Sequence, residues 1–234
     1  MGSTTINPTT SLGELVLENP ERARLFEAHR IDYCCGGAAS LAEACEEEGV
    51  DVEQLLVELA ELDERGVPDD TREFDSPAEL IDFIVEHHHD YLREELEPLG
   101  QLVDKVERVH GDSNPELHEI ADAYRALARE LLSHIAQEEE WVFPAIRRIH
   151  EEGPSDGDAE EVTELLDEID HEHDHAAGRL RRIRDLSDAY TVPEGACASY
   201  RNMFARLERL ASDTHMHVHR ENNILFPQAR EQLA

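Results

Sequence analysis

The chain has 234 residues, which suffices for one large domain or for a small domain followed by a medium one. Its formal net charge is −34, from 55 acidic and 21 basic residues, and Lys105 is the only lysine. Such a charge repels a phosphate backbone, so the composition argues against nucleic-acid binding.

The acidic residues are spread along the whole chain rather than gathered in a tail. A surface of this kind repels itself, and dissolved salt screens the repulsion. We therefore expect a halophilic host with a salt-rich cytoplasm, and an acidic protein from an ordinary host is the alternative. The melting temperature should rise between low and molar salt; an unchanged melting temperature would contradict this interpretation.

Neither a secretory signal nor a membrane span is predicted. No basic start followed by an apolar run marks a signal peptide. No run approaches the roughly 20 apolar residues that span a bilayer. The cysteines do not form the spaced framework of a disulfide-rich protein; they are Cys34, Cys35, Cys45 and Cys197. We expect a soluble protein in a reducing cytoplasm.

The sequence of the first part of the chain, to about Leu62, predicts a series of short helices. Two capping boxes of the form S-x-x-E begin helices after Ser11 and Ser40. Gly49 is a C-terminal stop signal, and Asp51 can cap the helix that follows it. Residues 1–66 are therefore predicted to form a small helical domain.

Residues 66–70, which contain glycine, proline and two aspartates, are the predicted linker. Ser76 and Pro77 then combine an N-cap with a proline at the first helical position, and Ser113 and Pro115 have the same form. These signals begin two long helices.

A polar break at 153–158 precedes a third helix that we expect to run to about Tyr190, and residues 192–195 precede a fourth. No segment alternates with the period of a strand over a useful length. The sequence therefore predicts an all-α protein, in which residues 75–234 form an antiparallel four-helix bundle.

One motif occurs twice in the second part, at 134–144 and 217–227: H-x-x-x-E-x-x-x-(V/L)-F-P. Residues four apart on a helix share a face. Each copy therefore presents one imidazole and one carboxylate in the same direction, as a metal that accepts mixed nitrogen and oxygen ligands requires. A single pair of this kind is usually a solvated helical pair, but the duplication favours a site.

The histidines are concentrated in the second part, with one cluster on each predicted helix. The clusters are His87, His88 and His89; His134; His171, His173 and His175; and His215, His217 and His219. One inward histidine from each helix and two glutamates would form a dinuclear carboxylate site, as helix bundles do. Iron is favoured over zinc, because structural zinc prefers four ligands.

Several motifs together resemble a known family. They are Leu12-Gly-Glu-Leu15, Asp32-Tyr-Cys34-Cys35-Gly36-Gly37, Lys105-Val-Glu-Arg-Val-His110, Glu172-His173-Asp174 and the two copies of the repeated motif. The second part resembles the hemerythrin-like HHE cation-binding domain. The first part resembles the short N-terminal domain of the ScdA and YtfE type of repair-of-iron-centres proteins. The resemblance covers nearly the whole chain.

The resemblance implies a di-iron centre, with a bridging oxygen and two bridging glutamates. Its implied ligands are His89, His134, Glu138, His173, His217 and Glu221. His89 is favoured because Asp90 follows it, and His88 is the alternative. His171 and His175 form an H-x-x-x-H pair, which leaves a five-histidine site open.

Cys34 and Cys35 are adjacent in a glycine-rich segment. A disulfide between neighbours is strained, so we expect free thiols that can bind a metal or exchange disulfides. The alternative is two small residues that fill a turn. Cys45 and Cys197 lie on apolar helical faces and are expected in the core.

The resemblance implies a function in the repair of iron–sulfur clusters damaged by oxidative or nitrosative stress, with damaged iron–sulfur proteins as partners. Two alternatives stay open. One is a sensor or carrier of dioxygen or nitric oxide, and the other is a di-iron reductase of nitric oxide or peroxide. Neither a nucleic acid nor a membrane is an expected partner, and a homodimer through the first part is possible.

Overall fold

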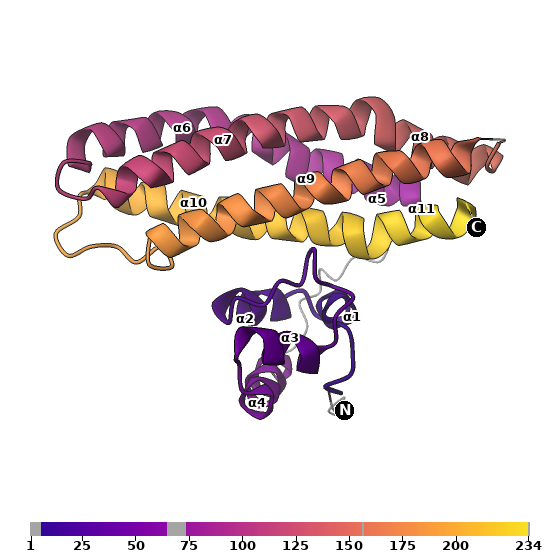
Figure 1. Cartoon of the computed structure of the whole chain (residues 1–234), viewed down its shortest axis with the longest axis horizontal. Helices are drawn as coiled ribbons and strands as arrows, with labels where there is room; N and C mark the ends of the chain where they lie inside the picture. The colour runs from indigo at the N-terminus through magenta and orange to yellow at the C-terminus, as the bar shows by residue number, and fades with distance from the viewer. Residues whose placement is uncertain (1–5, 65–73, 156, 234) are drawn as a thin grey trace. The chain divides into compact units, whose positions relative to one another are not determined.

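The computed structural model describes residues 6–64, 74–155 and 157–233 (Figure 1). Within these ranges the ordered elements are helices, with one isolated bridge between Ser11 and Ser40 and no strand. The predicted all-α class is confirmed. No helix in the described part of the chain combines the length and the apolarity needed to cross a bilayer. The predicted linker at 66–70 lies outside the described residues.

The chain divides into two compact units. The N-terminal unit comprises Met1–Asp75 together with Val218–Pro227, and the bundle unit comprises Ser76–His217 together with Gln228–Ala234. Residues 218–227 thus belong to the N-terminal unit, although in the sequence they continue the last long helix of the chain.

Four short helices form most of the N-terminal unit: α1 (Leu12–Glu18), α2 (Arg22–Ala28), α3 (Leu41–Glu48) and α4 (Val52–Asp63). The expected caps are present. Ser11 and Ser40 form complete capping boxes, Gly49 ends α3 in the left-handed conformation, and Asp51 caps α4. The local sequence therefore places α1, α3 and α4, since each cap satisfies backbone groups at a helix end.

A buried guanidinium connects three of these helices. Arg22 is 4% exposed and donates to the Leu15 carbonyl at 2.9 Å and to the Asp63 carboxylate at 2.7 Å. Glu18 accepts a further bond from the same side chain. A buried charge persists only when it is paired and hydrogen-bonded, so Arg22 holds α1, α2 and α4 in register.

The bundle consists of four long helical runs, and Figure 1 shows that they follow one another in antiparallel order. Three of them contain a π-helical turn. The runs are α5 (Pro77–Ile84), η1 (Val85–His89) and α6 (Asp90–His110); α7 (Glu116–Gln137), η2 (Glu138–Val142) and α8 (Phe143–Glu152); α9 (Asp158–Leu186); and α10 (Ala198–Arg220), η3 (Glu221–Leu225) and α11 (Phe226–Leu233).

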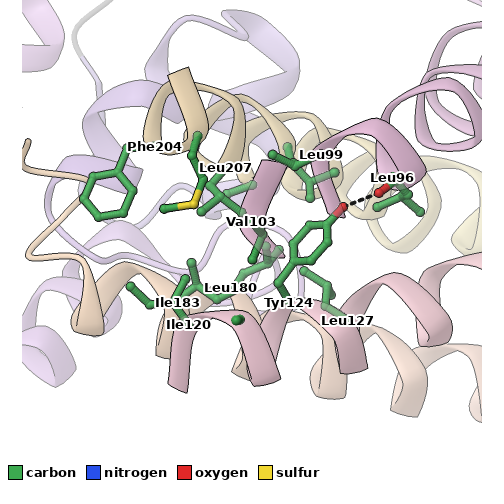
Figure 2. Packing of buried hydrophobic residues seen from close by; sticks show 14 of the residues in the cluster. Leu96, Leu99, Val103, Ile120, Tyr124, Leu127, Leu180, Ile183, Phe204 and Leu207 are labelled. Carbon is green, nitrogen blue, oxygen red and sulfur yellow. Dashed lines mark hydrogen bonds between the residues drawn. The ribbon is translucent and has the colours of Figure 1, made fainter. Parts of the chain in front are cut away.

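An apolar core fills the part of the bundle where α6, α7, α9 and α10 pack (Figure 2). Leucine, isoleucine and valine predominate in it, and the Tyr124 hydroxyl donates to the Leu96 carbonyl at 2.5 Å. Along α6 and α9 this core begins after His89 and His173, and along α10 it ends before His217. The histidines therefore stand at one end of the apolar core.

Two expectations about helix ends are wrong. Ser76 caps α5 as expected, but α7 begins at Glu116 without a side-chain cap, so the serine before Pro115 does not repeat the arrangement. The third long helix ends at Leu186 rather than near Tyr190.

The early end of α9 has a local cause. Asp188, Ala189 and Tyr190 have φ angles of 48°, 52° and 60°, which no right-handed helix permits. The Ser187 hydroxyl accepts from the Tyr190 amide at 3.0 Å, and the Tyr190 ring is buried in the apolar core. Burial of this ring favours the turn over a further turn of helix.

Candidate metal centre

Each of the three π-helical turns begins or ends at a predicted ligand. The first ends at His89, the second begins at Glu138 and the third begins at Glu221. A π turn adds one residue to a helical turn and is frequent at functional sites. It changes which side chains face the interior, so it can direct an imidazole or a carboxylate into the bundle where a regular helix would not.

Glu138 is fully buried and lies between two pairs of imidazoles. Its Oε2 is 3.2 Å from His89 Nε2 and 3.8 Å from His217 Nε2. Its Oε1 is 3.3 Å from His134 Nε2 and 4.0 Å from His173 Nε2. Each carboxylate oxygen thus faces its own histidine pair.

The two nitrogens within each pair are also close together. His89 Nε2 and His217 Nε2 are 3.2 Å apart, and His134 Nε2 and His173 Nε2 are 3.1 Å apart. Bonds of about 2.0–2.1 Å from a metal to nitrogen place neighbouring ligand atoms roughly 3 Å apart. Each pair therefore has the spacing of two ligands on one cation.

Glu221 is buried and completes both groups of ligand atoms. One group is His89, Glu138, His217 and Glu221, and the other is His134, Glu138, His173 and Glu221; within each, the atoms lie within 4.8 Å of one another. All six predicted ligands thus occur in the two groups, and the two glutamates are the members that the groups share.

The residues fit a bound cation. Neither oxygen of Glu138 accepts a hydrogen bond, although the side chain is fully buried. Burial would raise the pKa of Glu138, but the imidazoles of His134, His89 and His217 outweigh it and hold this pKa well below its usual range. A buried carboxylate without a compensating partner costs several kcal/mol. A cation between the oxygens and the imidazoles would supply that partner.

The structure also separates the alternatives within two histidine clusters. His89 belongs to a ligand group, whereas His88 Nδ1 contacts Asp213 Oδ1 at 3.1 Å. His171 and His175 are exposed and lie against each other, and neither belongs to a group found in the described residues. His171 and His175 therefore lie outside both ligand groups, and His173 is the member of their cluster that lies in one.

Two carboxylates that the sequence did not single out as site residues hold the outer nitrogens of the imidazoles. His89 Nδ1 donates to Glu139 Oε1 at 2.7 Å, and His134 Nδ1 donates to Glu172 Oε2 at 2.8 Å. Arg93 donates to the same Glu139 oxygen at 2.7 Å. Such outer partners fix the tautomer and the ring orientation of a metal-binding histidine. The His89–Glu139 contact joins two helices, so no local spacing in the sequence signals it.

We expect Glu139→Gln to weaken metal binding by about 10–100-fold. The amide is a weaker acceptor for the His89 ring than the carboxylate, and it removes the shorter of the two ion pairs of Arg93, which leaves only the pair with Asp90. Metal titration followed by calorimetry measures the effect. Glu140→Gln is the matched control, because Glu140 is adjacent but exposed; equal affinities for the two variants would contradict a supporting role for Glu139.

The segment 32–37, called the thiol loop below, is organised by one carboxylate. Asp32 Oδ1 accepts from the amides of Cys34 and Cys35 at 3.2 and 3.0 Å and from the Cys34 thiol at 3.1 Å. Cys34 is buried and Cys35 is partly exposed, and both are free thiols, as the sequence predicted. Hydrogen bonding to Cys35, burial and the Asp32 carboxylate raise the pKa of the Cys34 thiol well above its usual range.

The two thiols are close enough to share a cation. Their sulfurs are 3.9 Å apart, and Asp32, Cys34 and Cys35 offer ligand atoms that lie within 4.8 Å of one another. Two thiolates bound at about 2.3 Å to one tetrahedral ion are roughly 3.8 Å apart. This spacing fits one cation shared by the two sulfurs.

The other two cysteines differ from each other. Cys45 is buried, as predicted, but Cys197 is exposed, so the expectation that it lies in the core is wrong. Cys197 immediately precedes the first residue of α10 rather than lying on its apolar face. Hydrogen bonds from the backbone amides at the start of α10 lower the pKa of its thiol.

Both parts of the chain match known protein families. Residues 8–63 match ScdA_N, a domain of unknown function, and residues 79–229 match the hemerythrin HHE cation binding domain. The chain belongs to the hemerythrin HHE family. The family match and the two His/Glu groups both indicate that the bundle binds a metal cation.

Several relatives align with almost the whole of this chain, across both matched domains. The chain is 35% identical over 218 residues to the iron-sulfur cluster repair protein ScdA of Staphylococcus haemolyticus, covering 92% of this chain and 95% of the relative. It is 32% identical over 219 residues to the iron-sulfur cluster repair protein YtfE of Yersinia pseudotuberculosis, covering 94% and 96%. The YtfE of Pectobacterium carotovorum is 33% identical over 221 residues, with the same coverage. Within the HHE family, the chain is therefore a member of the ScdA and YtfE group.

Proposed function

We propose that this protein restores iron–sulfur clusters damaged by oxidative or nitrosative stress, by holding two iron ions in the bundle and donating iron to the damaged cluster. The observation that carries the proposal is the position of Glu138, whose two oxygens each face a separate histidine pair. The names of the relatives, which describe iron–sulfur cluster repair, support the same activity.

The ligand set favours iron. Four imidazoles and two carboxylates provide six protein ligands for two ions, whereas structural zinc prefers four ligands for one ion, often with cysteine. Imidazole suits iron, and carboxylate adds negative charge that offsets the charge of the ions. Six protein ligands also leave coordination positions free for a bridging oxygen or a small molecule such as nitric oxide.

The thiol loop would receive iron on its way to an acceptor. Cys34 and Cys35 would each lose a proton on binding iron, because the thiolate and not the thiol is the ligand. A site of two thiolates and one carboxylate binds iron through fewer protein ligands than the bundle does, so it can pass the ion on to an acceptor rich in thiolates. The acceptor would be a damaged iron–sulfur protein of a salt-rich cytoplasm.

Reversible binding of dioxygen or nitric oxide is the second candidate, and reduction of nitric oxide at the same centre is the third. The free coordination positions favour both. Neither function requires Cys34 or Cys35, so the thiol loop distinguishes them from iron donation.

A repair assay tests the proposal. The iron-loaded chain is mixed with an iron–sulfur hydratase that nitric oxide has inactivated, and the recovery of hydratase activity is followed. We expect faster recovery than with the same amount of ferrous iron and a small thiol, and loss of the advantage in Cys35→Ser. Cys197→Ser is the matched control, since Cys197 lies outside the thiol loop. Recovery no faster than with free iron would refute iron donation.

A further inference from the structure

The side chain of Asn223 contacts the thiol loop directly. Its Nδ2 donates to the Cys34 carbonyl at 3.0 Å and to the Tyr33 carbonyl at 3.4 Å. Asn223 lies in η3, and its segment belongs to the same compact unit as the thiol loop. These two carbonyls belong to the peptide bonds immediately before and after the Cα atom of Cys34.

Two glycines form the walls of the space that Asn223 occupies. A Cβ atom on Gly37 would lie 2.0 Å from Asn223 Oδ1, and one on Gly13 would lie 2.8 Å from the same atom. The Gly13 amide donates to the Gly37 carbonyl at 2.8 Å, which joins the two walls. Gly37 does not have a positive φ. It is required for space and not for backbone conformation.

Asn223 is also tied to its own helix. Its Nδ2 lies 3.2 Å from His219 Nδ1, one turn earlier, and the His219 ring packs against the Tyr33 ring with centroids 5.7 Å apart. Glu221, which belongs to both ligand groups, is the first residue of the same π-helical turn. A shift of this turn therefore reaches the thiol loop through the Asn223 side chain.

We propose that Asn223 is a positioning residue that holds the thiol loop closed over Cys34, so that Cys35 reacts first and Cys34 follows when this contact opens. Closure accounts for the difference in exposure, since Cys34 is 3% exposed while its neighbour is accessible. Only the purpose of the two thiols, which is to bind iron on its way to an acceptor, rests on the proposed function. It specifies an order of reaction that iron donation alone does not require.

The rate at which each cysteine reacts with iodoacetamide tests the proposal. Peptide mass spectrometry of the full chain follows the four thiols separately. In the unaltered protein we expect Cys35 to react much faster than Cys34. In Asn223→Asp an acceptor of the same shape faces the two carbonyls, and we expect the Cys34 rate to rise about tenfold, as the loss of both hydrogen bonds implies.

The chain contains the controls for this experiment. Cys45 is buried in the same unit, so its rate reports any general unfolding, and Cys197 is exposed and gives the reference rate. Asn202→Asp makes the same chemical change at an exposed position of α10. If the Cys34 rate is unchanged in Asn223→Asp, or if it rises only together with that of Cys45, Asn223 does not control the thiol loop.

A double-mutant cycle tests the fit of Asn223 between the glycines. We expect Gly37→Ala to raise the Cys34 rate in the unaltered chain, because the added methyl group displaces Asn223. In Asn223→Ala the atoms that this methyl group would meet are absent, so the same change should have little further effect. Additive effects would overturn the proposed fit. Neither experiment measures repair, so their failure and the failure of the proposed function are distinguishable.

Discussion

Replacing Glu138 by glutamine is expected to remove most of the metal from the purified protein. The carboxylate offers one oxygen to each histidine pair, whereas an amide offers one oxygen and one NH₂ group, which cannot bind a cation. One of the two proposed metal positions would therefore lose a ligand outright, and the other would lose negative charge. The affinity should fall by more than the roughly 10–100-fold that loss of a supporting residue costs.

Metal analysis and the absorption spectrum of the protein as purified measure this effect. Glu140→Gln is the matched control, because it alters an exposed glutamate two residues away. Glu221→Gln should resemble Glu138→Gln, since both residues belong to both ligand groups. If a variant that carries both Glu138→Gln and Glu221→Gln retained its iron, the centre described here would not be the iron site.

Removing the metal is expected to lower the melting temperature of the bundle strongly. A ligand present at 1,000 times its dissociation constant stabilises a fold by about 4.1 kcal/mol, so the two proposed ions would together contribute roughly 8 kcal/mol. For a domain of this size each kcal/mol corresponds to about 2–4 °C. We therefore expect the melting temperature to fall by about 15–30 °C. The physical reason is that removal of the metal leaves Glu138 buried without a cation.

Differential scanning calorimetry of the metal-loaded and chelated proteins measures the decrease. Glu138→Gln provides the control, since chelation should alter its melting temperature little once the metal is already lost. Equal melting temperatures for the loaded and chelated forms of the unaltered chain would mean that metal binding and folding are not coupled.

Much of the fold could be predicted from local patterns. Ser11, Ser40, Asp51 and Ser76 cap helices as their sequences indicate, because a capping side chain acts on backbone groups within three residues. The end of α9 could not be predicted in this way. It depends on the burial of the Tyr190 ring against residues from distant parts of the chain.

The sequence by itself determined the His/Glu pairs at 134–138 and 217–221, since helical periodicity alone places residues four apart on one face. Only the tertiary structure decided which of three consecutive histidines faces the centre, because neighbours on a helix point in directions about 100° apart and η1 shifts that direction at His89. It also decided the partners that come from other elements, Glu139 for the His89 ring and Asn223 for the thiol loop. These contacts join residues 50 and 189 positions apart, and no local pattern encodes a contact of that range.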